Sequence, residues 1–330
     1  MSTRRAFLGG LGAAGIAAAA PSALWADDGR RLLTATDVHV KDYPTVAAIE
    51  WIGQQLQQAT GGRLGLRMYH SGQLGRESEA IDMARFGAID ITRVYSGALN
   101  NAFPLTQVLS LPYVFDSVAH LRRALDGTVG AQVLRGFASR ELVGLAIYDC
   151  GARCFYNTRR PIHTPADMHG LKFRVPSSDI FMRMIRLLGG NPTPLAYGEV
   201  FSALQTHLID GAENNLRSFH SSRQFEAAHY WSQSAHSYAP DVLLMSQRSF
   251  DSLRVGDREL LLDLARRSVT VMRQRWDESD TAARAALIAA GVRMNDCDLP
   301  AFRAAVAPLL SDYHRVPALE ALYRDVRSLA

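Results

Sequence analysis

The run of residues 257–290 constrains the fold more than any other part of the chain. It contains neither proline nor glycine, and most of its residues favour helices. Its apolar positions recur near the spacing of an α-helix. One helix of about thirty residues would be about 45 Å long, which is longer than a single domain of this size requires. We favour one helix that runs along two domains over two helices that break near Glu278.

The residues before this helix alternate between short apolar segments and amphipathic ones. This order predicts helices layered on a sheet of parallel strands, an α/β fold. The order recurs in the second half of the chain, and about 300 residues are enough for two domains. The predicted strands are residues 31–35, 64–69, 89–94, 142–148, 172–175 and 211–213, and the main helices are residues 44–60, 120–125, 129–140 and 197–208, the last with Leu208 facing inward.

The N-terminus has the pattern of an export signal. Residues 1–26 begin with a basic pair, continue with a run rich in alanine and glycine, and end in small residues. The apolar run is too short to cross a bilayer comfortably, and residues 3–8 fit the twin-arginine pattern. We expect cleavage after Ala26 or Ala23 and a soluble mature chain in the periplasm.

Charge and cysteine content exclude some partners. The formal net charge of +4 includes Arg4 and Arg5 of the signal, which leaves +2 for the mature chain. So small a charge argues against a nucleic-acid partner. Cys150 and Cys154 could form a local bridge in an oxidising compartment, but we favour buried free cysteines. Neither CxxC nor CxxCH is present to suggest redox or haem chemistry.

The sequence contains no recognisable catalytic or metal-binding motif. Its ten histidines lack HxH or HExxH spacing, and no GxSxG sequence occurs. His229 and His236 are expected to pack or to form hydrogen bonds rather than to bind metal. We therefore predict a binding protein that is not an enzyme and uses neither a cofactor nor a metal.

Arg153 and Arg174 are the best candidates for a binding site. Each lies beside a predicted strand, and Pro176 ends the strand that contains Arg174. An arginine at a strand end can direct its planar, charged fork into a cleft and hold a carboxylate through two hydrogen bonds. Most arginines are simply solvated, so this pattern remains a hypothesis: the chain captures a small organic anion.

Several collinear motifs resemble the substrate-binding proteins of tripartite ATP-independent periplasmic (TRAP) transporters. The first are GLKFRVP, the upstream GAR and the downstream ALQTHLIDGAENN. No single motif is specific, but together they cover essentially the whole mature chain. The others are HSGQLGRESEAIDMARFGAIDITRV, LSLPYVF, NPTPLAYGEVFSALQT and FEAAHYWSQSAHSYAPDVLLMS.

This resemblance implies the two-domain periplasmic-binding-protein fold, an α/β architecture with a ligand cleft between the domains and a long helix that spans both. The chain is expected to cross between domains near Cys150 and Ala239. The first domain would comprise residues 27–150 and 239–277, and the second residues 151–238 and 278–330.

The resemblance also implies roles for three residues. In this family the arginine of the KFRVP-like strand binds the ligand carboxylate, and Arg174 occupies that position. The arginine of the GxR turn often adds a contact, which matches Arg153, and the asparagine after DGxE matches Asn214. Two cations and one neutral amide suit the binding of a carboxylate, because an unpartnered carboxylate is costly to bury.

Within the family, AENN followed by a serine-rich turn and then a DVLLMS strand, together with the loop DVHVKDY, resembles a subgroup associated with uronic acids such as D-glucuronate and D-galacturonate. Such a ligand carries several hydroxyls, so its cleft needs polar walls. Departures at Ser218-Phe219-His220 and Gln224-Phe225 keep other small acids open, namely a C4 dicarboxylate, a keto acid or pyroglutamate. The candidate residues for the hydroxyls are His39, Glu77, Arg93, Asp149 and Asn215.

Two of these candidates have ordinary alternatives. Glu77 would also suit the first turn of a helix, and His39 would suit a solvated loop. The expected partners are a small carboxylate and the membrane permease subunits of a TRAP transporter, with the binding protein itself a monomer. A sensor that passes its closed form to a signalling receptor would use the same cleft.

Overall fold

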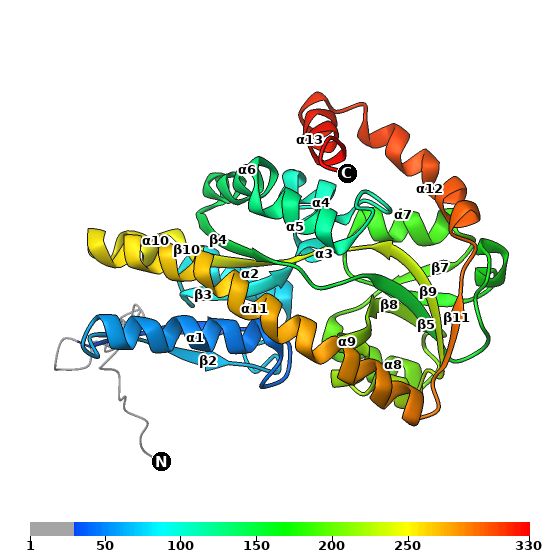
Figure 1. Ribbon diagram of the computed structural model, residues 1–330, viewed down its shortest axis with the longest axis horizontal. Coiled ribbons are helices and arrows are strands. Elements are labelled where there is room, and N and C mark those ends of the chain that lie inside the picture. Colours follow the sequence, from blue (N-terminus) through cyan, green and yellow to red (C-terminus); the bar gives the residue numbers. More distant parts are fainter. Residues whose placement is uncertain (1–29) are drawn as a thin grey trace, which may run out of the picture.

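The computed structural model describes residues 30–330, so the predicted export signal at residues 1–26 lies outside the described residues. Two β-sheets lie side by side, each with helices on its faces (Figure 1). The chain therefore has the predicted α/β architecture of two sheet-based halves.

The first sheet has the strand order β2-β1-β3-β10-β4. β1 pairs in parallel with β2 and β3, as the alternation of strands and helices predicted. β10 is antiparallel to both β3 and β4, so the prediction of an all-parallel sheet was wrong. The reason is that the chain returns from the second sheet beside the ends of β3 and β4. β10 begins there and therefore runs in the opposite direction to both strands. The bounds are β1 Arg31–Thr36, β2 Leu64–Tyr69, β3 Ile91–Tyr95, β4 Leu142–Tyr148 and β10 Asp241–Ser246.

The second sheet has the order β11-β9-β5-β8-β6-β7. β6 is parallel to β7 and β8, whereas β5 is antiparallel to β8 and β9. This arrangement places β5 beside β8, and therefore Arg153 directly opposite Asn215 in the register. The bounds are β5 Arg153–Asn157, β6 Lys172–Val175, β7 Asn191–Pro194, β8 Gly211–Asn215, β9 Tyr230–Ser237 and β11 Arg293–Asp296.

Helices cover both faces of each sheet. α1 and α11 pack on one face of the first sheet, and α2 and α6 on the other. In the second half, α7 and α12 lie on one side, and α8 and α9 contribute to a hydrophobic cluster on the other. The bounds are α1 Pro44–Ala59, α2 Glu77–Phe86, α3 Ser96–Leu99, α4 Gln107–Ser110, α5 Val118–Asp126, α6 Thr128–Gly136, α7 Asp179–Leu187, α8 Val200–Gln205, α9 Leu216–Ser221, α10 Gln247–Asp251, α11 Val255–Ala289, α12 Leu299–Tyr313 and α13 Pro317–Arg327.

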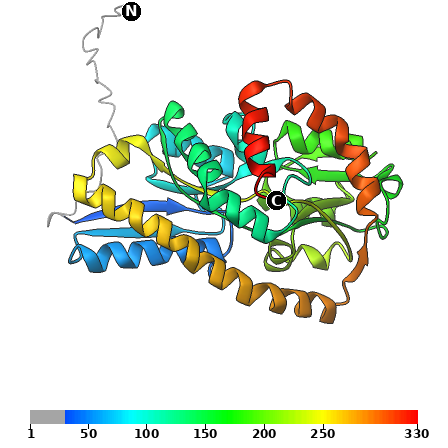
Figure 2. The same cartoon turned by 45° about the horizontal axis from the view of Figure 1, so that its top comes forward.

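The long helix predicted for residues 257–290 is present as the single helix α11, which has 35 residues and no break near Glu278. It packs against α1 and β4 in the first half and against α9 in the second. Figure 2 shows it running along both halves of the molecule. The prediction that one helix spans the two sheets is therefore confirmed.

The chain passes from the first sheet to the second between β4 and β5, and it returns between β9 and β10. At these crossings the Sγ of Cys150 donates a hydrogen bond of 2.9 Å to the carbonyl of Ala239. Gly151 has a φ of +68°, a left-handed conformation that favours glycine. Cys150 and Cys154 are buried free thiols, not a disulfide.

Every strand of the first sheet comes from residues 27–150 or 239–277, and every strand of the second comes from the other two predicted ranges. The C-terminal residues contact both halves. α12 packs on α7, whereas α13 packs on α4 and α6. The Nε2 atom of His120 in α5 lies 2.8 Å from the carbonyl oxygen of Val326 in α13.

The predicted helix at residues 197–208 is shorter than expected. A 3₁₀ turn, Tyr197–Glu199, leads into α8, which ends at Gln205. Leu208 is 55% exposed, so the prediction that it faces inward was wrong. The chain turns away at His207, which has a φ of +57°, and the helical spacing therefore no longer applies to Leu208.

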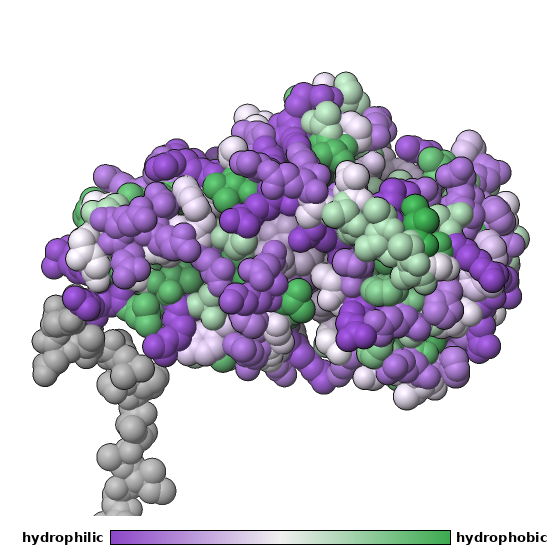
Figure 3. All heavy atoms as spheres, turned by 60° about the horizontal axis from the view of Figure 1, so that its bottom comes forward, coloured by the Kyte–Doolittle hydropathy of each residue, from purple (hydrophilic) through white to green (hydrophobic). Residues whose placement is uncertain are grey.

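Figure 3 shows hydrophilic residues over most of the visible face, with hydrophobic residues in small groups. None of the helices in residues 30–330 combines the length and the apolar character that spanning a bilayer would require.

Candidate functional site

A polar cavity lined mostly by buried side chains lies between the two sheets. Its volume is about 30 Å³, which is room for about one or two water molecules. Anything larger can enter only if the two halves of the molecule move apart or the side chains around the cavity rearrange. The cavity is lined by Val38, His39, Glu77, Arg93, Tyr95, Cys150, Arg153, Arg174, Tyr197, Asn214, Asn215, Ser218 and Asp241.

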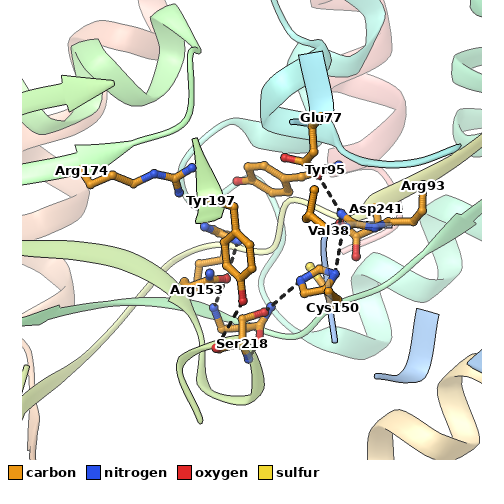
Figure 4. Close-up of a pocket in the computed structure, with 13 residues that line it drawn as sticks. Val38, Glu77, Arg93, Tyr95, Cys150, Arg153, Arg174, Tyr197, Ser218 and Asp241 are labelled. Atoms are coloured by element: carbon orange, nitrogen blue, oxygen red, sulfur yellow. Dashed lines mark hydrogen bonds and ion pairs between the residues drawn. The ribbon is translucent and has the colours of Figure 1, made fainter. Parts of the chain in front are cut away.

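Arg174 is the cation that the protein leaves least compensated in this cavity. It lies in β6 and is only 5% exposed. Its Nε donates to the carbonyl of Leu195 at 2.8 Å, and its two terminal nitrogens have no hydrogen-bond partner among residues 30–330. Figure 4 shows its guanidinium group reaching toward the centre of the site. Burial lowers the pKa of Arg174, an effect that Glu213 only partly offsets. The group therefore favours an anionic ligand.

Arg153 is buried but already paired. Its Nε lies 2.6 Å from Oε2 of Glu213, and its Nη2 lies 2.9 Å from Oε1 of the same carboxylate. Its guanidinium carbon lies 4.4 Å from the ring centroid of Tyr95. Burial acts to raise the pKa of Glu213, but Arg153 and His236 bring it down to about 2. Arg153 therefore has less charge to offer a ligand than Arg174 has.

Asn214 and Asn215 present amide donors from β8. The Oδ1 of Asn214 accepts from Nη1 of Arg153 and from the backbone N–H of Asn215, both at 2.9 Å. The Oδ1 of Asn215 accepts from the backbone N–H of Ser218 at 2.7 Å and caps α9. With both oxygens occupied and no partner for either Nδ2 among the described residues, the side-chain N–H groups are available to a ligand.

Arg93 lies on the opposite side of the site from Arg174 (Figure 4). It is 1% exposed and is surrounded by carboxylates. Its Nε donates to Asp37 at 3.0 Å, and its Nη1 donates to Glu77 at 2.9 Å and to Asp241 at 3.2 Å. Its Nη2 contacts Asp37 and lies 2.7 Å from Nδ1 of His39. Its N–H groups are therefore all engaged within the protein.

Two carboxylates beside Arg93 retain a free oxygen. Oε1 of Glu77 accepts from Nη1 of Arg93 and from the backbone N–H of Tyr95 at 2.9 Å, whereas Oε2 has no partner among residues 30–330. Only Oδ1 of Asp241 contacts Arg93. Burial, together with the nearby carboxylates of Asp37 and Glu77, raises the pKa of Asp241 despite Arg93.

His39 belongs to an aromatic group at the boundary between the two halves. Its ring stacks on Tyr43 with centroids 3.8 Å apart, and Tyr197 approaches its edge at 5.2 Å. The hydroxyl oxygens of Tyr43 and Ser218 lie 2.8 Å apart, which joins the start of α1 to α9. The Nε2 of His39 lies 3.5 Å from the same serine oxygen. His39 thus lines the cavity as predicted, from a buried position rather than a solvated loop.

Asp149 is not part of the cavity. It is fully buried, 2.9 Å from Nε of Arg122 and 2.5 Å from Nε of Arg273. These two ion pairs connect Asp149 to α5 and α11. Its side chain does not line the cavity, where the other predicted site residues lie. The prediction that Asp149 binds a ligand hydroxyl finds no support in this position, because the next residue, Cys150, is the one that lines the cavity.

The structure places seven of the eight predicted site residues around one cavity, all except Asp149. Tyr95, Tyr197, Ser218 and Asp241 also line the cavity, although the sequence did not indicate them as site residues. Asp241 could have been suspected, because it follows the predicted crossing at Ala239. No group of three or more His, Cys, Asp or Glu side chains within residues 30–330 is arranged to hold a metal ion.

Comparisons with known proteins agree with this fold. A model of the family DctP, bacterial extracellular solute-binding protein, family 7, matches residues 36–315. A solute-binding protein from Chromohalobacter salexigens is 36% identical over 293 residues, which are 88% of this chain and 87% of that protein.

Solved structures extend the likeness to three dimensions. A TRAP periplasmic solute-binding protein from Bradyrhizobium sp. BTAi1, in complex with D-galacturonate, has a TM-score of 0.89 and 43% identity, and covers 90% of this chain and 100% of its own. One from Roseobacter denitrificans, with bound β-D-glucuronate, has a TM-score of 0.87 and 38% identity, and covers 89% of this chain and 98% of its own. This chain belongs to the family 7 extracellular solute-binding proteins, the solute-binding proteins of TRAP transporters.

Proposed function

We propose that this protein captures a hexuronate, D-galacturonate or D-glucuronate, in the periplasm and delivers it to the permease of a TRAP transporter. The observation that carries this proposal is Arg174, a buried cation whose terminal nitrogens face a polar cavity and have no hydrogen-bond partner in the described part of the chain. Burying such a group is unfavourable unless an anion completes it. The relatives from Bradyrhizobium and Roseobacter, which hold uronates, support the choice of ligand class.

In this proposal Arg174 forms two hydrogen bonds with the ligand carboxylate, and the amides of Asn214 and Asn215 donate to the same end of the ligand. Arg153 contributes mainly by position, because its bonds to Glu213 and Asn214 orient the asparagine. Charge-assisted bonds of this kind are about twice as strong as neutral ones. No general acid or base is needed, and the ligand is released unchanged.

The hydroxyls of the sugar acid would face the other wall. The free oxygens of Glu77 and Asp241 accept hydrogen bonds, and His39 offers a ring nitrogen. Arg93 does not read the ligand directly in this arrangement, because its N–H groups are engaged. It holds the carboxylates in place.

Binding would occur by closure of the two domains. A cavity of about 30 Å³ cannot admit a sugar acid without opening. Two contacts between the halves would stabilise the closed form. The hydroxyl of Tyr43 contacts that of Ser218 in the interior, and Arg76 forms an ion pair of 2.6 Å with Glu199 at the exposed rim. The ligand shifts this equilibrium by its greater affinity for the closed form. The closed monomer is the form that a permease would recognise.

Calorimetric titration of the mature chain with each hexuronate tests this proposal. We expect binding by the wild type and a loss of about 2–5 kcal/mol, about 30- to 5000-fold in affinity, in Arg174→Ala. Arg183→Ala is the matched control, because Arg183 is an exposed arginine that pairs with Asp312. Absence of binding to either uronate, or an unchanged affinity in Arg174→Ala, would contradict the proposal.

A further inference from the structure

The two walls of the cavity carry opposite charge. On the side of the second sheet, Arg153 and Arg174 face a single carboxylate, Glu213, which leaves one formal positive charge. On the side of the first sheet, a single guanidinium, that of Arg93, is surrounded by three carboxylates, which leaves two formal negative charges while His39 is neutral. These carboxylates are Asp37, Glu77 and Asp241.

Among the described residues, the acidic wall offers hydrogen-bond acceptors but no spare cation. Asp37 is fully engaged, because Oδ1 contacts Arg93 and His39 while Oδ2 contacts the hydroxyl of Thr45 at 2.6 Å. Glu77 and Asp241 each contribute one oxygen to Arg93 and keep the other free. Since every N–H group of Arg93 is engaged, a second anion on this wall finds no free guanidinium or ammonium group among the described residues and faces only the imidazole of His39.

We infer that Glu77 and Asp241 make the site selective for monocarboxylates, whose far end is uncharged and carries hydroxyl groups. A ligand with a second carboxylate, such as an aldarate or a C4 dicarboxylate, is rejected. This inference rests on the proposed function, because it takes Arg174 to be the residue that binds the first carboxylate. A hydroxyl donates a hydrogen bond to a free carboxylate oxygen, whereas a second carboxylate has no hydrogen to donate and meets like charge.

Reversing a dicarboxylate in the site does not relieve the repulsion. Whichever carboxylate lies at Arg174, the other must lie toward Glu77 and Asp241. Arg153 cannot serve as a second anchor, because Glu213 holds it through two of its nitrogens. A shorter dicarboxylate leaves more distance to the acidic wall but gains no cation. The asymmetry of charge therefore excludes the class rather than one member of it.

The experiment compares three six-carbon acids by calorimetric titration of the wild-type mature chain at neutral pH. D-galacturonate carries one carboxylate, galactonate is an open-chain acid with one carboxylate, and galactarate is the open-chain acid with two. We expect galactarate to bind at least about 100-fold more weakly than galacturonate, because like charges across a desolvated interface cost several kcal/mol. Galactonate should bind more tightly than galactarate.

Variants separate charge from shape. Glu77→Gln and Asp241→Asn keep the size of each side chain but remove its charge, and each should reduce the ratio of galacturonate to galactarate affinity by about tenfold. Asp82→Asn is the control, since Asp82 lies on the same helix as Glu77 with a side chain 61% exposed. Circular dichroism verifies folding; if Asp241→Asn does not fold, Glu77→Gln alone decides.

The outcomes distinguish this inference from the proposed function. If galacturonate and glucuronate both fail to bind, the proposed function is wrong. If galacturonate binds and galactarate binds within about tenfold of it, the selectivity is wrong and the proposed function stands. If galactonate is excluded as strongly as galactarate, or if Glu77→Gln and Asp241→Asn leave the ratio of galacturonate to galactarate affinity as it is in the wild type, the ring shape of the ligand selects it and the charge of the wall does not.

Discussion

Arg153 and Glu213 form a buried ion pair in which Nε of the arginine lies 2.6 Å from Oε2 of the glutamate. One of the two arginines predicted to bind the ligand is therefore neutralised within the protein, whereas Arg174 is not. The two arginines therefore have different roles in the site. Arg153 holds the side chain of Asn214, and under the proposed function Arg174 is the residue that attracts the anion.

Removing the charge of Glu213 should destabilise the empty protein. Glu213→Gln leaves Arg153 buried without a counter-ion, which typically costs about 3–5 kcal/mol. Because a bound carboxylate restores part of the missing charge, the ligand should raise the melting temperature more in the variant than in the wild type. Thermal unfolding with and without galacturonate measures this. Glu226→Gln, which breaks an exposed pair with Arg223, should change neither quantity appreciably.

The same carboxylate predicts an acid limit to stability. The pKa of Glu213 is about 2 in the folded state, against an ordinary value of 4.5. A carboxyl group with a lowered pKa stabilises fully above its unfolded value and loses that contribution as the pH falls through the folded one. The free energy of unfolding should therefore decrease as the pH falls from 4.5 toward 2. Urea denaturation over a series of pH values should show a shallower dependence in Glu213→Gln.

Stability and binding should oppose each other at Arg174. Arg174→Met replaces a poorly compensated buried cation with an apolar side chain of similar length, a kind of change that stabilises some proteins by about 1–4 kcal/mol. We expect the empty variant to unfold at a higher temperature than the wild type and to lose uronate binding. A lower melting temperature in Arg174→Met would show that the cation is compensated after all.

Asp149 should support the structure rather than the ligand. It accepts from both Arg122 and Arg273 while fully buried, so Asp149→Asn should lower the free energy of unfolding by about 3–5 kcal/mol. Asp126→Asn provides the control, because Asp126 pairs with the same Arg273 from an exposed position and should cost less than about 1 kcal/mol. Equal losses of stability in the two variants would contradict this assignment.

The contact of Tyr43 with Ser218 should favour closure. Tyr43→Phe removes a hydroxyl that lies 2.8 Å from the serine oxygen across the two halves. The expected loss is about 0.5–1.5 kcal/mol of binding energy, or about 2- to 13-fold in affinity. Tyr148→Phe is matched, because its hydroxyl makes an equal contact of 2.8 Å with Ser268 behind the first sheet. Titration should show reduced uronate affinity in the first variant alone.

Local patterns predicted local structure well. The strands at Leu64–Tyr69, Leu142–Tyr148 and Lys172–Val175 have the predicted bounds, and α11 is the predicted single helix. The bounds of these segments could be predicted because apolar periodicity and the positions of proline and glycine depend only on residues within the same helix or strand. The antiparallel direction of β10 and β5 could not be predicted from these patterns, because it depends on where the chain crosses between the sheets.

The site could be predicted only in part. Arg174 was recognisable from its strand and from the resemblance. The pairing of Arg93 with Asp37, Glu77 and Asp241 was not, because it joins residues far apart in the sequence. A charged residue at a strand end looks the same in sequence whether it faces a ligand or a counter-ion. Asp149 and Asp241 show this, since each lies beside a crossing and only Asp241 lines the cavity.

The course of the chain between the sheets limits how this protein can change over evolutionary time. β10 of the first sheet follows β9 of the second, β11 of the second follows α11, and α13 returns to the first half. Neither half is encoded by one continuous stretch of gene, so recombination cannot exchange a domain with a single insertion. Exchange of a whole half between two such proteins would therefore require several coordinated replacements along the chain.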